Sequence, residues 1–189
     1  MNDKLEEMQK LADLIANKND IDGNIASIIK RPTLIGHAGE YIASRILNIT
    51  LAESAAHKGS DGIFTQGVLC GKTVNIKWYT NHERILDINP NALPDYYLVL
   101  TGALKNPSSS RLTTRPWTID YVFLFNASKL IETLKSRGVK IGIATSVAMQ
   151  LWEKAQIYPE SCSSEYILTE EQKCLFSLFK KANSGGTSS

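Results

Sequence analysis

The spacing of hydrophobic residues changes period near the middle of the chain. In the first third, apolar residues recur every three or four positions, which is typical of helices with one buried face. This pattern predicts a helix over about the first eighteen residues, a short helix over residues 25–29 and a third over residues 36–47. The polar stretch 19–23 ends the first, and Pro32 ends the second because proline disfavours helical backbone in the residue ahead of it.

Strand patterns replace helical ones from residue 62 onward. Residues 62–65 and 72–79 are predicted to form two strands joined by a hairpin at residues 67–71. Residues 96–100 and 121–125 are continuous apolar runs, which are typical of strands covered on both faces.

The last third of the chain alternates between the two patterns. We expect a helix capped by Ser128, a short strand over residues 139–143 and a helix over residues 146–156. Thr169 and Gln172 match a capping box at the start of a final helix. The order of elements predicts an α/β protein with a mixed central β-sheet flanked by helices.

Length and composition favour one globular domain. The chain has 189 residues, of which 43% are hydrophobic and 21% charged. We expect an N-terminal helical segment (residues 1–30), a core (31–181) and a flexible Gly/Ser-rich tail (182–189). No apolar run approaches the roughly 18 residues of a membrane span, and no signal peptide is recognisable. Three scattered cysteines suit a reducing compartment, so the expected location is cytoplasmic.

Basic residues concentrate in one part of the sequence. The net charge is only +2, but residues 104–140 hold seven basic and two acidic residues, a local balance of +5. This asymmetry permits a phosphate-facing surface that includes Arg111 and Arg115, with simple solvation as the alternative.

The predicted strand over residues 72–79 carries polar residues where a buried strand normally has none. Because alternate residues share a face, Val74, Ile76 and Trp78 point one way while Asn75 and Lys77 point the other. Asp61 stands just before the preceding strand, so the hairpin brings it toward the same place. Glu40 could reach that place from the helix over residues 36–47.

This set of residues resembles the PD-(D/E)xK nuclease superfamily, which has the restriction-endonuclease-like fold. The matching segments are Glu40 on a helix, Ser60-Asp61-Gly62 at one strand and Asn75-Ile76-Lys77 on the next. The resemblance implies an Mg²⁺- or Mn²⁺-dependent nuclease that cleaves DNA, of the restriction or repair type. Such enzymes often work as homodimers because cutting two strands takes two sites; the sequence leaves the oligomeric state open.

The resemblance also implies a role for each residue. Asp61 would be the main ligand of the metal ion, helped by the Ile76 carbonyl, the Asn75 side-chain oxygen and Glu40, since hard divalent ions prefer oxygen ligands. Lys77 would hold the attacking water and offset developing charge.

Asn75 departs from the superfamily pattern, which has an acidic residue at this position. An amide oxygen is neutral, so the site loses one negative charge and should bind the ion more weakly. Glu40, or secondly Glu53, could supply the missing carboxylate. The alternative is a non-catalytic nucleic-acid-binding or assembly module that retains the nuclease fold.

Each residue of the set also has an ordinary structural interpretation. Asp61 suits a turn, Glu40 favours a helix dipole, and Lys77 could extend from a strand edge. His57 and Lys58 could contact a phosphate or simply pack as polar residues. His82 is expected in a loop. A position in the core or the sheet, rather than a base-stacking role, is expected for four aromatic residues: Tyr96, Tyr97, Trp117 and Tyr121.

Overall fold

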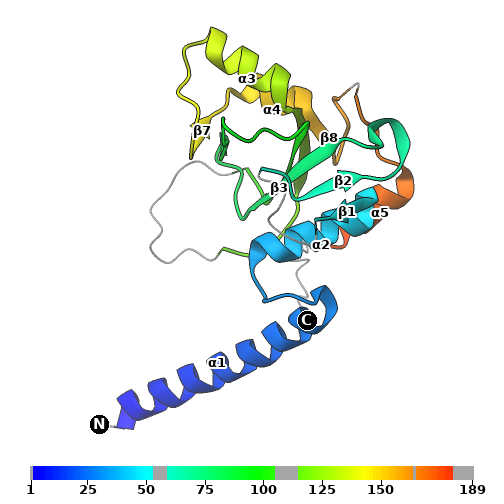
Figure 1. The fold of residues 1–189 in the computed structure, drawn as a ribbon. Coiled ribbons are helices and arrows are strands. Elements are labelled where there is room, and N and C mark those ends of the chain that lie inside the picture. The colour runs from blue at the N-terminus through cyan, green and yellow to red at the C-terminus, as the bar shows by residue number, and fades with distance from the viewer. Residues whose placement is uncertain (1, 53–58, 105–114, 164, 181–189) are drawn as a thin grey trace, which may run out of the picture.

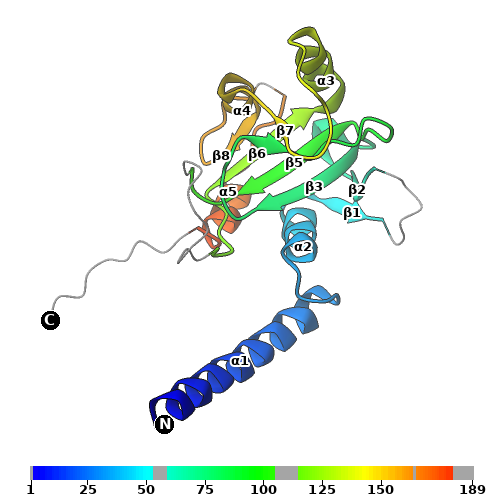
Figure 2. The same ribbon diagram turned by 90° about the vertical axis from the view of Figure 1, so that its left-hand side faces the viewer.

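A six-stranded β-sheet forms the centre of the computed structural model, which describes residues 2–52, 59–104, 115–163 and 165–180 (Figures 1 and 2). The strands lie in the order β1-β2-β3-β5-β6-β8. β3 and β5 are parallel, whereas the other neighbouring pairs are antiparallel. Their bounds are β1 Ile49–Leu51, β2 Gly62–Phe64, β3 Thr73–Tyr79, β5 Tyr96–Thr101, β6 Tyr121–Asn126 and β8 Gln156–Tyr158. The prediction of a mixed central sheet is confirmed.

Helices cover both faces of this sheet (Figure 2). On one face, α2 (Ile35–Leu47) and α5 (Glu170–Ser177) pack in a core that includes Val74, Ile76 and Trp78. On the other face, α3 (Ala127–Ser136) and α4 (Met149–Ala155) pack in a second core. A two-stranded ribbon of β4 (Ile85–Leu86) and β7 (Thr145–Ser146) lies beside that second core. β5 is buried along its whole length, as its continuous apolar run predicted.

The predicted hairpin lies where the sequence placed it. β2 pairs antiparallel with β3, with Gly62 opposite Val74, and the short 3-10 helix η1 (Gly67–Leu69) joins them. β3 is the third strand of six, so Asn75 and Lys77 lie on a central strand as expected. The capping box of Thr169 and Gln172 is also confirmed at the start of α5.

The predicted break after the first helix is wrong. α1 runs without interruption from Asn2 to Ile29 and absorbs the second predicted helix. Gly23 costs a helix only about 1 kcal/mol relative to alanine, which its neighbours can offset. Lys18 and Asp22 bridge the expected breakpoint with an ion pair one turn apart, at 2.5 Å.

Several predictions for the last third of the chain are also wrong. Residues 139–143 form an irregular segment that ends in a bend and a turn rather than a strand. α4 begins at Met149 because Ser146 belongs to β7, and Asn126 rather than Ser128 caps α3. Sequence periodicity missed the short strands β1, β4 and β8, which have only two or three residues each. The predicted tail (182–189) lies outside the described residues. No helix in the described part of the chain is both long and apolar enough to cross a membrane.

Candidate functional site

Asp61 is fastened to β3 by its backbone and its side chain. Its N–H donates to the Val74 carbonyl at 2.8 Å, which extends the β2–β3 ladder by one residue. Its carboxylate Oδ2 then accepts a hydrogen bond from the Ile76 N–H at 2.6 Å. The pairing of β2 with β3 stops at Gly62, so Ile76 would otherwise present an unpaired N–H at that edge. The carboxylate is thereby fixed beside the segment Asn75-Ile76-Lys77.

Three charged side chains lie within electrostatic range of this carboxylate. Burial is the main cause that raises the pKa of Asp61; the Ile76 hydrogen bond lowers it, and Glu40 raises it again through like charge. Lys77 and Arg31 lower the pKa by smaller amounts. Arg31 forms an ion pair with Glu40, so that carboxylate already has one cationic partner. Asp61 is therefore a half-buried acid, and its hydrogen bond and neighbouring cations do not fully offset the cost of burying its ionised form.

Asn75 and Lys77 line a small cavity on the other face of β3. The cavity has a volume of about 150 Å³, and Asp87 and Asn89 also line it. Asn75 is only 8% exposed, and its Oδ1 atom has no hydrogen-bond partner among the described residues. An orphaned buried oxygen is costly, so this atom is suited to a ligand that can occupy the cavity.

Asp87 is a candidate that the sequence reasoning missed. It follows β4, and its Oδ1 accepts a hydrogen bond from the Ala144 N–H at 2.7 Å, while its own N–H donates to the Tyr79 hydroxyl at 3.1 Å. The available signal was an acidic residue between two fully apolar neighbours, Leu86 and Ile88, which are 0% and 3% exposed. A carboxylate in that setting faces away from the core and toward the cavity that Asn75 and Lys77 share.

The predicted site residues lie around β3, some on each face of the strand. α2, which carries Glu40, covers the face of Val74, Ile76 and Trp78, whereas Asn75 and Lys77 point to the opposite face. Asp61 lies at the end of the hairpin, where the charges of both Glu40 and Lys77 shift its pKa. Among the residues that the structure describes, no three His, Cys, Asp or Glu side chains are grouped closely enough to hold a metal ion. A metal site here would therefore use neutral oxygens besides its carboxylates.

Four of the predicted residues lie outside the described ranges: Glu53, His57, Lys58 and Arg111. Arg115 is described, and it lines a larger pocket at the C-terminal end of β3. Of the two arginines predicted for a phosphate-facing surface, Arg115 is thus the one that the described ranges include.

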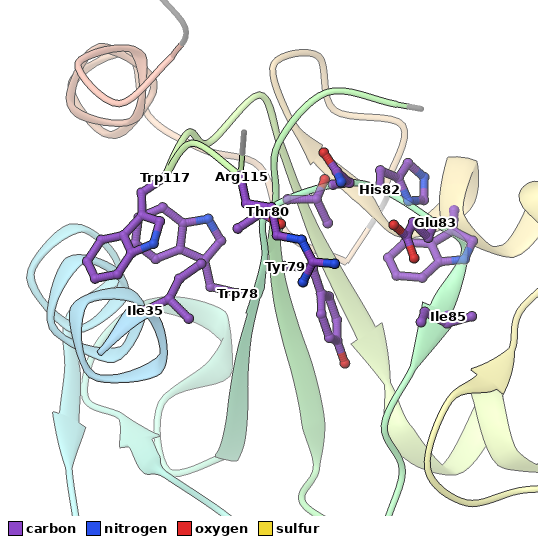
Figure 3. Close-up of a pocket in the computed structure, with 12 residues that line it drawn as sticks. Ile35, Trp78, Tyr79, Thr80, His82, Glu83, Ile85, Arg115 and Trp117 are labelled. Atoms are coloured by element: carbon purple, nitrogen blue, oxygen red, sulfur yellow. The ribbon is translucent and has the colours of Figure 1, made fainter. Parts of the chain in front are cut away.

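The larger pocket has a volume of about 440 Å³ and aromatic walls (Figure 3). Trp78 and Trp117 lie together on one side of it, Glu83 and His82 on the other, with Arg115 between them. The Trp78 N–H donates to the Thr118 carbonyl at 3.1 Å, which fixes that ring. Trp117 is 39% exposed, so the core position expected for it is wrong; Tyr96 and Tyr97 are buried as expected.

His82 lies in the connection between β3 and β4, as expected, but it is buried in the wall of this pocket. It is only 3% exposed, with ring centroids 4.6 Å from Trp152 and 5.0 Å from Phe123. Burial, assisted by the charge of Arg84, lowers the pKa of His82 to about 4, so the ring is neutral at pH 7. Neither ring nitrogen has a partner in the described part of the structure.

Comparison with known proteins identifies no relative: no protein-family model matches the sequence, and no curated protein matches it.

Proposed function

We propose that this protein is a metal-dependent nuclease with a restriction-endonuclease-like core that cleaves phosphodiester bonds in DNA. The observation that carries the proposal is the hydrogen bond from the Ile76 N–H to the Asp61 carboxylate. It places an acid across an antiparallel hairpin from a strand segment with an oxygen ligand and a lysine, Asn75 and Lys77. That juxtaposition is what cleavage of a phosphodiester needs from a protein.

The residues present fit a hard divalent cation. Burial is the main cause of the raised pKa of Asp61, the like charge of Glu40 adds to it, and a cation beside Asp61 would favour the ionised carboxylate. The Asn75 Oδ1 atom is a buried oxygen without a partner. Asp61, with the Ile76 carbonyl, would hold Mg²⁺ or Mn²⁺ at the edge of β3, with the Asn75 oxygen added from the cavity face and the charge of Glu40 from the α2 face.

Each residue has a defined task in this proposal. The ion, when bound, supplies Lewis-acid polarisation of the scissile phosphate and an acidified water. Lys77 orients the attacking water and offsets the negative charge that develops on the phosphate oxygens. The Ile76 N–H holds the Asp61 carboxylate in one orientation, and Arg31 restrains Glu40 through their ion pair.

Cleavage of plasmid and oligonucleotide DNA in Mg²⁺ or Mn²⁺ tests the proposal. We expect weak metal-dependent cleavage by the wild type, about 100-fold or more lower in Asp61→Asn and in Lys77→Ala, because each removes charge at the reacting phosphate. Glu40→Gln should reduce cleavage roughly tenfold or more through weaker metal binding. Matched controls on the exposed face of α3, Glu132→Gln and Lys135→Ala, should cleave like the wild type.

Asn75→Asp separates the enzyme from the second candidate, a nucleic-acid-binding module without activity. The neutral amide in place of an acid favours this second candidate. If Asn75 faces the ion, Asn75→Asp restores one negative charge and should tighten Mg²⁺ binding measured by calorimetry. No cleavage by any variant, together with no measurable metal binding, would contradict the nuclease and leave the binding module.

A further inference from the structure

Three buried polar groups without partners belong to residues that line the aromatic pocket at the end of β3. They are the ring nitrogens of His82, the hydroxyl of Thr101 and the indole N–H of Trp152. These residues are 3%, 1% and 0% exposed, and their polar atoms find no hydrogen bond within the described ranges. Each such group costs free energy unless something in the pocket satisfies it.

The chemistry of the pocket selects a flat ligand with mixed polarity. A neutral histidine offers one donor and one acceptor, threonine offers both, and the indole N–H only donates. A bare phosphate needs donors alone and a cation needs acceptors alone, so neither uses this set fully. Trp117 presents a partly exposed ring beside the fixed Trp78, at a centroid distance of 5.8 Å. Arg115 adds a positive charge at the pocket.

We propose that this pocket binds a single nucleobase of the nucleic-acid substrate, stacked on Trp117 and hydrogen-bonded to His82, Thr101 and Trp152. The proposal rests on the proposed nuclease function and adds base recognition to it. The two sites share β3: Lys77 belongs to the first and Trp78 to the second. The side chains of Lys77 and Trp78 point to opposite faces of β3, so the base in the pocket would belong to a nucleotide beyond the end of the strand rather than to the one at the scissile phosphate.

Intrinsic fluorescence reports directly on this pocket because all three tryptophans of the chain, Trp78, Trp117 and Trp152, line it. The experiment titrates the protein in EDTA, without cleavage, with a short single-stranded oligodeoxynucleotide. The comparison probe is an abasic oligomer with the same number of phosphates. We expect saturable quenching and at least tenfold tighter binding for the oligomer with bases, since stacking on an aromatic ring favours every base.

Variants of the lining residues test whether the pocket causes the tighter binding of the oligomer with bases. Trp117→Ala and the double variant His82→Phe/Thr101→Val should bind the two oligomers almost equally, whereas Val68→Ala, at an exposed residue outside this pocket, should behave like the wild type. Equal binding of both oligomers by the wild type would overturn the proposal and indicate a pocket filled by water. Because no metal is present, failure of cleavage and failure of base binding are measured separately.

A separate observation concerns α1, which extends away from the rest of the molecule (Figures 1 and 2). Apart from its C-terminal end near α2, the helix is exposed. Its apolar side chains nevertheless repeat at alternating three- and four-residue steps, a seven-residue repeat interrupted by Lys18 and Asp22. The row consists of Met8, Leu11, Ile15, Ile25 and Ile29. A flanking row at seven-residue spacing consists of Leu14, Ile21 and Ile28, which are 57%, 58% and 62% exposed.

Such a repeat describes one helix of a coiled coil. An isolated helix in water gains little stability from its own hydrogen bonds, so a stripe of exposed leucine and isoleucine requires a partner. Lys18 and Asp22, which interrupt the apolar row, indicate the chemistry of the partner helix. They have opposite signs and occupy successive positions of the same row.

We infer that α1 pairs with α1 of a second copy of this chain in an antiparallel coiled coil. In that arrangement Lys18 of each copy faces Asp22 of the other, and the same register sets Ile15 opposite Ile25, whereas Ile29 is already buried within its own chain. The pairing satisfies two-fold symmetry, which makes each contact occur twice. A parallel pair in register would instead oppose Lys18 to Lys18 and Asp22 to Asp22. From Ile15 to Ile25 the antiparallel overlap spans eleven residues, about 17 Å of helix at 1.5 Å per residue.

Charge-reversal variants of the full chain test this arrangement by sedimentation velocity over a range of concentrations. The wild type should dimerise, and Lys18→Glu or Asp22→Lys alone should weaken dimerisation at least tenfold. The double variant Lys18→Glu/Asp22→Lys should recover it, because each reversed charge again faces its opposite. An equimolar mixture of the two single variants should also dimerise, although neither has an attractive pair within its own helix.

The results distinguish the antiparallel dimer from its alternatives. A monomeric wild type at all concentrations would overturn the inference. Single variants that dimerise like the wild type, or a double variant that fails to recover, would overturn the antiparallel register. Circular dichroism of each variant verifies that α1 remains helical.

Discussion

At the scale of single residues, the candidate sites consist of buried polar groups whose partners are missing or mismatched. The Asp61 carboxylate has a raised pKa, the Asn75 oxygen is unpaired, and His82 is neutral inside an aromatic wall. Each arrangement lowers the stability of the folded chain relative to an apolar residue in the same place. Sites that bind ligands commonly accept such costs, which is why these residues are the most informative ones for function.

Asp61→Asn should keep or increase the stability of the protein at pH 7 while it abolishes cleavage. The folded-state pKa of Asp61 is raised above 3.8, so the folded state holds its proton more tightly than the unfolded state. Its contribution to stability is complete below pH 3.8 and is lost as the pH rises through the raised pKa. Asparagine keeps an oxygen for the Ile76 N–H and has no ionisation to lose.

Urea unfolding at several pH values measures this effect. The free energies of unfolding of the two proteins should approach each other near pH 4 and separate in favour of Asp61→Asn toward pH 7. A variant about 1 kcal/mol or more less stable than the wild type at pH 7 would show that the ionised carboxylate supports the fold.

His82 should make the protein less stable in mild acid. Its folded-state pKa of about 4 is depressed from 6.5, so between these values the unfolded state binds the proton and the folded state does not. Stability should fall as the pH decreases from 6.5 toward 4, by an amount on the order of 3 kcal/mol. Urea unfolding of His82→Phe should lose this slope, and His37→Phe, which leaves His82 in place, should retain it.

At the scale of secondary-structure elements, the close contact of α2 with β3 positions Glu40 against the hairpin that carries Asp61. A Cβ atom at Gly39 would lie 3.0 Å from the Trp78 Cβ and 3.2 Å from its Cε3. The helix approaches the strand this closely because Gly39 has no side chain. The residue next to the candidate ligand Glu40 therefore sets how near that ligand comes to the sheet.

Gly39→Ala should destabilise the protein by about 1–3 kcal/mol, because the added methyl forces α2 away from Trp78. Gly36→Ala on the same helix is the matched control: nothing lies within 4 Å of the added atom. There alanine improves helix propensity and should stabilise by about 0.5–1 kcal/mol. Thermal and urea unfolding measure both, and equal effects at the two positions would contradict the close-packing explanation.

At the scale of the whole molecule, α1 and the body, which is the β-sheet with the helices that cover it, are stabilised by different interactions. The body has two apolar cores, one on each face of the sheet, whereas α1 leaves most of its apolar side chains exposed in a single chain, from Leu5 to Ile21 and at Ile28. The stability of the body is thus a property of one copy. The order of α1 becomes a property of two copies if the helices pair as we infer.

The melting temperature of the wild type should rise with protein concentration, because dimerisation stabilises the folded state by mass action. Ile21→Asp places a charge in the apolar interface, at a side chain that is 58% exposed in one chain. It should remove the concentration dependence and leave the melting temperature at low concentration nearly unchanged. Calorimetry over a hundredfold range of concentration measures this; a wild-type melting temperature independent of concentration would contradict it.

The sequence by itself determined the features that depend on local periodicity and local capping. These include α2, the β2–β3 hairpin, the buried strands β5 and β6, the capping box of α5, and the neighbourhood of Asp61 and the Asn75-Ile76-Lys77 segment. All of them follow from side chains within a few residues of one another or across one short turn. The hydrophobic pattern is strong there because each element buries one face, or both, against a large sheet.

Tertiary structure alone decided the rest. The strands β1, β4 and β8 have two or three residues, too few for a period, and exist because a neighbouring strand supplies their hydrogen bonds. Asp87 and His82 acquire their settings from cavities built by distant segments of the chain. Burial, pKa and the absence of a hydrogen-bond partner are properties of three-dimensional neighbours, and no pattern along the chain contains them.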